Sequence, residues 1–426
     1  MNGNGSADSY YAASANPSPP YPPLETDVSC DVCVIGGGIT GCSAALNLAE
    51  RGYHVVLLEA ARIGHGGSGR SGGQMIHGYA RGMDEVRRLV SPDDARKLWD
   101  LSVEALNLTR GRIEKHNIRC DFTPGYMSVA IKPRQLRELA DEQRELEAQY
   151  GYQGLRRVEV DELRSLVDSP RYLGGLFDPH SGHLHPLNYT LGLADAATDA
   201  GATIHEHSPA VALNLADTVL VKTPSASVKC RYLVLSGGAY MEELVPSLRR
   251  TIMPVGTYIT ATQPLGEARA HSLIRNSMAV CDMNFVLDYF RLSADHRLLF
   301  GGRVSYSTFQ PPGLAAVLYQ RMLQVFPQLA GIRQDYTWGG FVDITMNRFP
   351  HFGLLRPNVF FAQGFSGHGI ALTGLAGKLL AEAVAGTAER FDLFARVRHH
   401  DFPGGKLMRM PLLVLAMAWF RFRDML

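Results

Sequence analysis

Short apolar runs separated by glycines organise the first sixty residues. The run Val32–Ile35 has the length of a strand, and the alanine-rich segment Cys42–Arg51 has the composition of a helix. Gly52 ends that segment, and a second apolar run, Val55–Leu58, follows it. A strand, a helix and a strand in this order predict a parallel βαβ unit. We therefore expect an α/β fold that begins with a Rossmann-like domain.

The pattern changes near residue 84, where longer segments with helical spacing of apolar residues begin. Helices are expected at 84–115, 132–150 and 310–325, and strands at 121–131, 157–160, 253–263, 288–292, 297–302 and 334–343. The strands at 288–292 and 297–302 are expected to form a hairpin. These segments predict an α+β domain that is interleaved with the first domain and built on an antiparallel sheet.

Two later segments repeat the pattern of the first domain. Tyr232–Ala239 is an apolar run that ends in glycines, and Val359–Gln363 is another, followed by a helix at 372–384. Because the carboxyl ends of parallel strands face the ligand in open α/β sheets, both runs are expected to bring glycines to one site. The chain is thus predicted to leave and re-enter the first domain.

The first βαβ unit contains a dinucleotide fingerprint, Gly-x-Gly-x-x-Gly, at Gly36, Gly38 and Gly41, with an acid at Glu59. The first glycine permits a sharp turn, the second lets a pyrophosphate approach the main chain, and the third lets the helix lie close to the sheet. The phosphates would sit at a helix N-terminus, where free N–H groups favour negative charge. Glu59 would bind a ribose diol, and its charge disfavours a 2′-phosphate.

A second glycine segment, residues 62–74, follows the acid and contains six glycines. So many glycines are costly unless the backbone approaches something closely, which indicates a second part of the cofactor site, nearer the reactive ring. A flexible linker is the alternative. A third glycine turn, Gly364–Gly369, opens the helix at 372–384, and a helix N-terminus there would stabilise negative charge on a reduced ring.

These patterns divide the chain into six parts. We expect an N-terminal arm at 1–27, a cofactor domain at 28–83, 176–250 and 351–426, and a substrate domain at 84–175 and 251–350. The arm is rich in proline and is expected to be extended, lying on the body or on a neighbouring subunit. Residues 180–186, which contain His183 and His185, are expected to form a loop. A metal site there is not expected, because no third ligand has matching spacing.

Composition and charge narrow the function. The formal net charge is +1, from 42 Lys and Arg against 41 Asp and Glu, and no basic stripe indicates nucleic-acid binding. Cys30 and Cys33 have CxxC spacing, but Cys33 lies inside the predicted strand, so buried thiols in a reducing compartment are expected. No secretory signal is visible in residues 1–30, and a cytoplasmic protein is expected. The apolar run Pro411–Phe420 is too short to span a membrane. We expect a helix packed on the body there, with a membrane-interface helix as the alternative.

The three glycine segments together resemble those of the D-amino-acid-oxidase superfamily of FAD-dependent amine oxidoreductases. The second segment includes Gly67–Gln74, and the third, Gly364–Gly369, is specific to that superfamily. The N-terminal Ser9–Asn16 and the segment Gly182–Asn188 are similar to the branch that oxidises gamma-glutamylputrescine. The resemblance implies FAD as the cofactor. No cysteine lies between Trp338 and Phe361, where the sarcosine-oxidase branch attaches its flavin, so non-covalent FAD is expected.

The resemblance and the glycine segments give a set of candidate site residues. Those expected to bind FAD are Gly36, Gly38, Ile39, Thr40, Gly41, Glu59, Ala60, Ser68, Gly69, Arg70, Ser71, Gly72, Gly73, Gln74, Val211, Gly237, Gly364, Ser366, Gly367, His368, Gly369 and Ile370. Tyr258, Tyr289, Arg348 and His77 are candidates for substrate binding, although both tyrosines could equally be core residues. Arg348 could hold a substrate carboxylate or form a surface ion pair. Ala371 stands where the sarcosine-oxidase branch has a carboxylate-binding lysine.

The implied chemistry is the oxidation of a C–N bond by hydride transfer to flavin N5, followed by hydrolysis of the imine. The flavin performs the redox step, so no catalytic side chain is assigned. The expected substrate is a small amine similar to gamma-glutamylputrescine, with O2 as acceptor and H2O2 as product. One alternative is a secondary amine of the iminodiacetate or N-substituted glycine type. Others are a membrane-docked dehydrogenase that reduces quinone and a non-catalytic FAD-binding protein. The oligomeric state is open.

Overall fold

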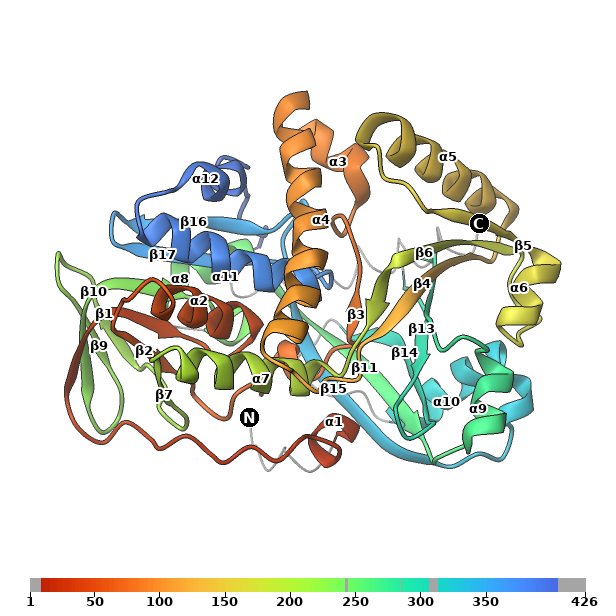
Figure 1. Ribbon diagram of the computed structural model, residues 1–426, viewed down its shortest axis with the longest axis horizontal. Coiled ribbons are helices and arrows are strands. Elements are labelled where there is room, and N and C mark those ends of the chain that lie inside the picture. Colours follow the sequence, from red (N-terminus) through yellow and green to blue (C-terminus); the bar gives the residue numbers. More distant parts are fainter. Residues whose placement is uncertain (1–8, 242–243, 285, 306–312, 405–426) are drawn as a thin grey trace.

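The computed structural model describes residues 9–241, 244–284, 286–305 and 313–404. Two sheets lie beside each other, with helix α4 (Pro92–Lys115) standing between them in Figure 1. The first sheet and its helices occupy the left of that view, and the second sheet occupies the right. This is the expected α/β fold with a second, α+β region. The run Pro411–Phe420 lies outside the described residues, so its two interpretations stay open.

The first sheet has a parallel centre with antiparallel edges. Its order is β16-β17-β10-β1-β2-β7, and β9 joins β10 to β8. Its strands are β1 (Val28–Ile35), β2 (Val55–Leu58), β7 (Thr203–His205), β8 (Ala212–Asn214), β9 (Val219–Lys222), β10 (Ser227–Leu235), β16 (His351–Arg356) and β17 (Val359–Gln363). Because β1, β2, β10 and β17 run in parallel, their carboxyl ends share one edge. That edge carries the first and third glycine turns.

Three apolar helices cover one face of this sheet. They are α2 (Ile39–Ala49), α7 (Pro186–Asp199) and α11 (Ile370–Val384). Every residue of α2 is buried, because α7 and α11 flank it and the sheet lies beneath. Small residues permit this closeness: a Cβ on Gly377 of α11 would lie 2.5 Å from Ser43 of α2. The remaining elements of this region are α8 (Pro246–Thr251), α12 (Glu389–Ala395) and the 3-10 turns η1 (Gly67–Gly69) and η2 (Gly238–Tyr240).

The second sheet is mainly antiparallel, in the order β15-β11-β14-β13-β12-β4-β6-β3, with β5 on β6. Its strands are β3 (Gln74–Met75), β4 (Thr123–Ala130), β5 (Arg156–Glu159), β6 (Gly174–His183), β11 (Met253–Thr262), β12 (Ala279–Asp282), β13 (Tyr289–Leu292), β14 (Leu298–Ser305) and β15 (Gln334–Ile344). One pair, β4 with β12, is parallel, which the expected antiparallel sheet did not include. The accompanying helices are α3 (Gly82–Leu89), α5 (Pro133–Tyr150), α6 (Val160–Leu166), α9 (Glu267–Leu273), α10 (Leu314–Val325) and η3 (Pro327–Leu329).

The prediction of a loop at residues 180–186 is wrong, because most of that segment belongs to strand β6. Its residues are polar in type, yet they form a buried strand, because their side chains find hydrogen-bond partners within the protein. Ser181 Oγ donates to Asp178, and the ring of His183 contacts the carbonyl of Ser277 at 2.8 Å. β6 runs across the predicted domain limit between residues 175 and 176. α4, which was assigned to the substrate domain, also lies against α11 of the cofactor domain. The domain limits given above stay a prediction.

The N-terminal arm lies on the body of its own chain and is not wholly extended. Tyr10–Ala13 form a short helix, α1, which Ser9 caps by accepting the N–H of Ala12. Beyond it the chain runs along the first sheet as far as Leu24, which is buried.

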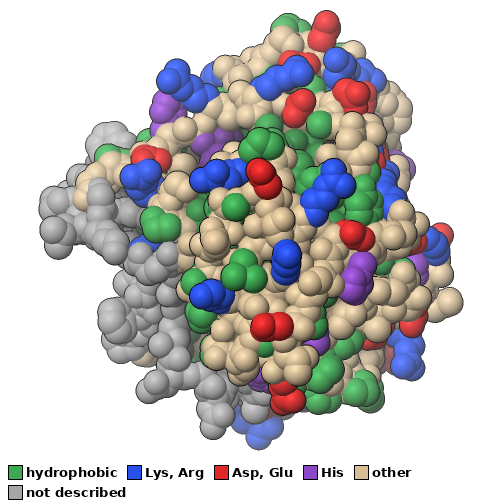
Figure 2. Space-filling model, turned by 90° about the vertical axis from the view of Figure 1, so that its left-hand side faces the viewer, with side chains coloured by type: hydrophobic (Ala, Val, Ile, Leu, Met, Phe, Trp, Pro, Cys, Tyr) green, Lys and Arg blue, Asp and Glu red, His purple; other side chains and the backbone are tan. Residues whose placement is uncertain are grey.

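The described helices contain no single one that is long and apolar enough to cross a membrane. α11 and α12 together meet that test of length and composition, but they are bent by 118° at the break between them. On the face shown in Figure 2, the Lys and Arg side chains are interspersed with Asp and Glu.

Candidate functional site

The first glycine turn connects β1 to α2 and needs glycine for two separate reasons. Gly36 has φ +109°, which favours glycine, and a Cβ there would lie 2.9 Å from the backbone nitrogen of Gly237. A Cβ on Gly41 would lie only 1.9 Å from the carbonyl oxygen of Gly36, so α2 can start this close to the strand only without one. The fingerprint glycines therefore bring β1, α2 and the end of β10 together.

The N-terminus of α2 has no side-chain cap of its own. Gly38 is the cap residue, and the hydroxyl of Ser68 from the second glycine segment accepts the N–H of Ile39 at 3.0 Å. A Cβ on Gly38 would lie 2.8 Å from that hydroxyl. Thr40 is the next residue of the same first turn and is buried. The arrangement leaves a helix N-terminus facing the junction of two glycine segments, which suits a phosphate.

Glu59 follows β2 and is fixed by backbone donors. Its two carboxylate oxygens accept the N–H groups of Gly37 at 2.6 Å and Ala61 at 2.8 Å. Burial raises the pKa of Glu59 above its usual value, and these two N–H groups oppose that shift. Ala60 beside it is exposed. A carboxylate held in this way keeps free lone pairs for the hydroxyls of a ribose.

The second glycine segment lies between the two sheets. Gly69 is close to Gly64, since a Cβ there would lie 2.2 Å from the Gly64 carbonyl oxygen. A Cβ on Gly72 would lie 2.7 Å from the ring of Tyr289, and one on Gly73 would lie 2.1 Å from the carbonyl oxygen of Leu184. These glycines permit close contact with the second sheet, which a flexible linker would not require.

The remaining residues of that segment continue into the second sheet. Arg70 Nε donates to the carbonyl of Gly339 at 2.6 Å, and the Arg70 carbonyl accepts the indole N–H of Trp338 at 3.0 Å. Ser71 Oγ is buried and has no hydrogen-bond partner among the described residues. Gln74 begins β3, and its side chain donates to Val280.

The third glycine turn follows β17 and is held by a carboxylate that the sequence did not reveal. Asp343, at the end of β15, accepts the N–H of Gly364 at 2.7 Å. Burial raises the pKa of Asp343 to about 6, and the N–H groups of this turn oppose the shift. In the sequence Asp343 is only a charged residue at the end of a predicted strand, 21 positions before Gly364, and that clue was too weak to identify it.

Two residues of the third turn have special roles. Ser366 adopts φ +54°, and its hydroxyl accepts the N–H of Thr345 at 3.3 Å. His368 Nε2 donates to the carbonyl of His77 at 2.7 Å, and burial lowers the pKa of His368 to about 4. The imidazole is therefore neutral near pH 7. Gly367 has φ +85°, and Gly369 is the uncapped N-cap of α11, whose first residue is Ile370.

Two predicted cofactor residues lie at the edges of this site. Gly237 follows β10 and touches the first glycine turn, as described above. Val211 has an exposed side chain, and its N–H donates to the carbonyl of Lys222. It follows Ser208, whose N–H donates to the carbonyl of Glu59, so the strand start lies near the acid.

The four candidates for substrate binding are not gathered in one place. Tyr289 faces Gly72, and the backbone of His77 holds His368, so these two lie beside the glycine segments. The His77 imidazole points toward Asp178 at 3.5 Å, and burial lowers its pKa. Tyr258 instead contacts Leu314 and Leu318 on the side covered by α10.

Arg348 lies in the turn between β15 and β16. Its N–H donates to the carbonyl of Thr345, and Thr345 is the residue of this turn that lies against the third glycine turn. Thr345 is within 2.4 Å of where a Cβ on Gly364 would be. Arg348 itself has φ +60°, a conformation that non-glycine residues seldom adopt. The substrate roles of all four candidates stay predictions.

A cavity of about 430 Å³ lies apart from the glycine turns, between α4, the end of α5 and α11. Trp99, Tyr150 and Tyr152 form its apolar side. Its charged residues are Asp100, Glu104 and Lys378; Glu104 is paired with Lys378 at 2.7 Å, and Asp100 is paired with Arg96 at 3.3 Å. The cavity therefore offers no charge that awaits a ligand, and the glycine segments remain the better candidate site.

The three glycine segments suit FAD. Two helix N-termini whose N-cap residues are glycines, an anchored acid and backbone that permits close approach converge at one edge of a parallel sheet. A family model described as FAD dependent oxidoreductase matches residues 31–383. The chain belongs to this family. The resemblance drawn from the three motifs is thereby confirmed, and so is FAD as the expected cofactor.

Relatives within the family match almost end to end. The chain is 44% identical over 421 residues to a Haemophilus influenzae protein named probable oxidoreductase OrdL, covering 98% of this chain and 97% of that one. It is 42% identical over 419 residues to gamma-glutamylputrescine oxidoreductase of Escherichia coli, covering 98% of each.

Solved structures share the fold at lower identity. Glycine oxidase from Geobacillus kaustophilus superposes with a TM-score of 0.74 at 21% identity, covering 87% of this chain and 99% of that one. Iminodiacetate oxidase from Chelativorans gives a TM-score of 0.68 at 19% identity, covering 83% and 95%. At these identities the likeness concerns the fold alone.

Proposed function

We propose that this protein is an FAD-dependent oxidase of a primary amine similar to gamma-glutamylputrescine. The observation that carries the proposal is the 42% identity to gamma-glutamylputrescine oxidoreductase, which extends over 98% of both chains. That span includes the N-terminal arm, which the general fold of the family does not require. The FAD would be bound without a covalent link, since no cysteine lies between Trp338 and Phe361.

In the proposed reaction the substrate amine loses a hydride from its α-carbon and a proton from its nitrogen, and so becomes an imine. FAD, when bound, supplies the oxidant by accepting that hydride at N5. Water then adds to the imine carbon and ammonia leaves, which gives an aldehyde. O2 takes up the two electrons and two protons and leaves as H2O2. Oxygen as the acceptor and a cytoplasmic location remain predictions.

The protein groups around the site support hydride chemistry on an uncharged amine. Burial lowers the pKa of His368 to about 4 and lowers that of His77, so neither imidazole carries a positive charge beside the amine near pH 7. Asp178 is buried and accepts Ser181 Oγ and the hydroxyl of Tyr152 at 3.0 Å, which fixes the carboxylate that faces His77. These residues would orient the substrate and exclude water, while the flavin carries the redox step.

Anaerobic bleaching of the bound flavin tests the proposal. Purified holoprotein is mixed with gamma-glutamylputrescine, putrescine or iminodiacetate, and the loss of visible flavin absorbance is followed. We expect gamma-glutamylputrescine to bleach the flavin fastest, and peroxide to form in equal amount to aldehyde once air is admitted. Bleaching by iminodiacetate alone would replace the proposed substrate with a secondary amine. Bleaching by none of the three would refute amine oxidation of this kind.

The attachment of the flavin is tested separately. Acid precipitation of the holoprotein should leave all of the yellow colour in the supernatant. Flavin that remains in the washed pellet would contradict non-covalent binding.

A further inference from the structure

The second tyrosine of the N-terminal arm is among the most deeply buried side chains of the described chain. Tyr11 has no exposed surface, although it lies on a helix of only four residues near the start of the chain. Its ring meets Trp338 and His185 edge to face, with centroids 5.3 and 4.9 Å away. Burying a phenol is costly unless its hydroxyl has a partner. The partner here is Arg291.

Arg291 on β13 is a buried cation that is held by neutral groups. It is 4% exposed, and its Nη2 donates to the hydroxyl of Tyr11 at 3.0 Å and to the carbonyl of Leu184 at 3.0 Å. Its Nε donates to the carbonyl of Gly72 at 2.8 Å, and Nη1 donates to the carbonyl of Leu292 at 3.1 Å. Within the described part of the chain, no carboxylate lies within ion-pair range of this guanidinium.

A charge in this setting depends on each of its acceptors. The desolvation of a buried guanidinium is several kcal/mol in order of magnitude, and only hydrogen bonds offset it when no anion is present. One acceptor is the arm, through Tyr11, and another is Gly72 of the second glycine segment. The two are therefore joined through one side chain.

A second connection runs in parallel with the first. Trp338, which touches the ring of Tyr11, donates its indole N–H to the carbonyl of Arg70. Arg70 and Gly72 are two positions apart in the second glycine segment, and Gly72 meets Tyr289 of the second sheet. Ser68 of this segment lies beside Gly38, where the nucleotide would be held, and the later residues from Arg70 onward lead away from it to the place where the two sheets meet. The flavin ring of a bound FAD would lie toward that end.

We propose that the N-terminal arm is a working part of the FAD site. Tyr11 is a positioning residue that fixes the Arg291 guanidinium, and Arg291 in turn fixes the backbone at Gly72, in the part of the segment that would hold the flavin end of FAD. The inference rests on membership of the FAD-dependent family and does not depend on which amine is oxidised.

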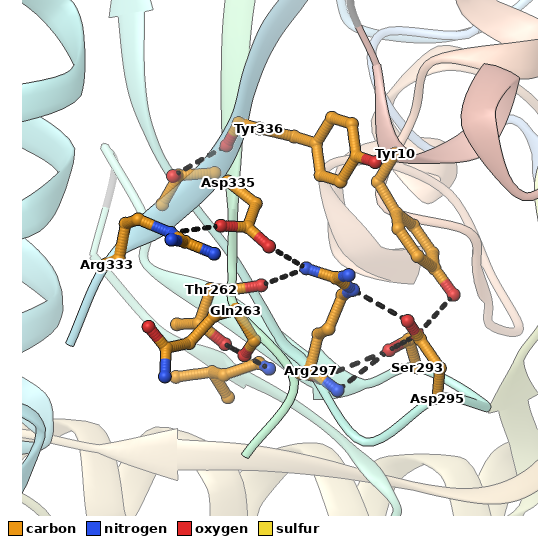
Figure 3. A network of polar contacts seen from close by, with 11 residues as sticks. Tyr10, Thr262, Gln263, Ser293, Asp295, Arg297, Arg333, Asp335 and Tyr336 are labelled. Atoms are coloured by element: carbon orange, nitrogen blue, oxygen red, sulfur yellow. Dashed lines mark hydrogen bonds and ion pairs between the residues drawn. The ribbon is translucent and has the colours of Figure 1, made fainter.

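The neighbouring tyrosine provides a matched control. Tyr10 lies on the same short helix, and its hydroxyl donates to Asp295 at 2.7 Å. Figure 3 shows that this contact belongs to a separate network of Asp295, Arg297 and Asp335. Among the described residues, no hydrogen bond or ion pair joins any of these three to the second glycine segment. Tyr10→Phe therefore removes the same chemical group from the same helix without touching Arg291.

The test measures cofactor binding by the apoprotein of wild type, Tyr11→Phe and Tyr10→Phe. Two probes are titrated: FAD, and ADP, which has the nucleotide end of the cofactor but no flavin ring. We expect Tyr11→Phe to weaken FAD binding about three- to tenfold, the net effect of one ordinary hydrogen bond, and to leave ADP binding within about twofold of wild type. Tyr10→Phe should leave both affinities within about twofold.

Each alternative outcome would overturn the proposal. Equal losses of FAD affinity in the two variants would make the arm a general stabiliser. Parallel losses of FAD and ADP affinity in Tyr11→Phe would indicate damage to the whole fold, and unchanged FAD affinity would exclude any role for Tyr11. Arg291→Lys is a second variant, because lysine keeps the charge but cannot reach Gly72 and Tyr11 together. It should weaken FAD at least as much as Tyr11→Phe does, and wild-type affinity would contradict the proposal.

The proposal and the proposed function fail separately. A protein that binds FAD but oxidises none of the amines loses the proposed function, while the difference between the two tyrosine variants is still measured. A protein that oxidises gamma-glutamylputrescine while Tyr11→Phe binds FAD normally loses only this inference.

Discussion

Two adjacent tyrosines on one short helix contact two arginines in opposite ways. Tyr11 meets Arg291, whose partners are carbonyls and a phenol, in a site closed to water. Tyr10 meets Asp295, which together with Asp335 surrounds Arg297 in a network that reaches the surface. The side chain of Asp295 is 46% exposed, whereas those of Arg297 and Asp335 are 12% and 18% exposed, so water competes mainly with the bonds of Asp295.

The difference shows how burial decides what a polar contact contributes. Exposed ion pairs contribute about 0–1 kcal/mol each, because water and salt screen the charges. A buried cation whose only partners are neutral acceptors loses far more when one acceptor is removed. We therefore expect the arm to be anchored at Tyr10 weakly and at Tyr11 strongly, although the two residues are neighbours.

The largest effect should follow from removing the buried cation itself. Arg291→Met leaves the carbonyls of Gly72 and Leu184 and the hydroxyl of Tyr11 without their donor, and should lower the free energy of unfolding by about 3 kcal/mol. Arg297→Met in the partly exposed Asp295 network is the matched variant and should cost about 1 kcal/mol, because two carboxylates there keep contact with water. Urea denaturation of the two apoproteins measures both, and equal costs would remove the distinction between the two sites.

The backbone that Arg291 holds should be nearly as sensitive. Gly73 has φ +74°, and a Cβ there would lie 2.1 Å from the carbonyl oxygen of Leu184, so Gly73→Ala combines strain with a clash. We expect a loss of about 3 kcal/mol. Gly266 has a similar φ of +77° with nothing within 4 Å, and Gly266→Ala should cost only about 1 kcal/mol. Thermal unfolding of the pair separates the clash from the φ strain, and a Gly266→Ala loss as large as that of Gly73→Ala would show that no clash exists.

Removing one hydroxyl from each tyrosine gives the next effect in size. Tyr11→Phe should lower the free energy of unfolding by about 1.5 kcal/mol, because it takes an acceptor from a buried cation. Tyr10→Phe should lower it by less than about 1 kcal/mol, since Asp295 keeps Ser293 and Arg297 as partners. Chemical denaturation is the measurement, and a Tyr10→Phe cost above that of Tyr11→Phe would reverse the comparison.

The smallest effect is a difference in pH dependence. Hydrogen bonding from Arg297 holds the pKa of Asp335 below its usual value, and bonds from Ser293, Tyr10 and Arg297 outweigh burial to lower that of Asp295. Carboxyls with lowered pKa values stabilise the fold above the unfolded value of about 4, and that stability is lost as the pH falls through the lower folded value. The cost of Tyr10→Phe should therefore shrink between pH 6 and pH 3. The cost of Tyr11→Phe should not change, because no carboxylate takes part in its contact.

Much of the cofactor region could be predicted because its signals are local. Gly36, Gly38 and Gly41 come between two apolar runs, and the turn that they form depends on backbone sterics that act within a few residues. The strand at 359–363 and the helix after it were predicted for the same reason. The FAD-dependent family followed from these motifs and is confirmed.

The second sheet was harder, since its strands are polar where their side chains are satisfied by distant partners. Asp178, Ser181 and His183 concealed strand β6, because their hydrogen bonds are visible only after folding. The substrate candidates show the same limit. Tyr258 and Tyr289 have similar sequence settings, yet one lies under α10 and the other against Gly72.

The sequence by itself determined the βαβ unit, the three glycine turns and the FAD-dependent family, because each is written in residues that are close together in the chain. Only the tertiary structure decided that Asp343 holds the third turn, that Tyr258 lies away from it, and that Tyr11 reaches Gly72 through Arg291. Tyr11 and Arg291 are 280 positions apart, and a contact over that separation is fixed by how two sheets pack rather than by any local preference.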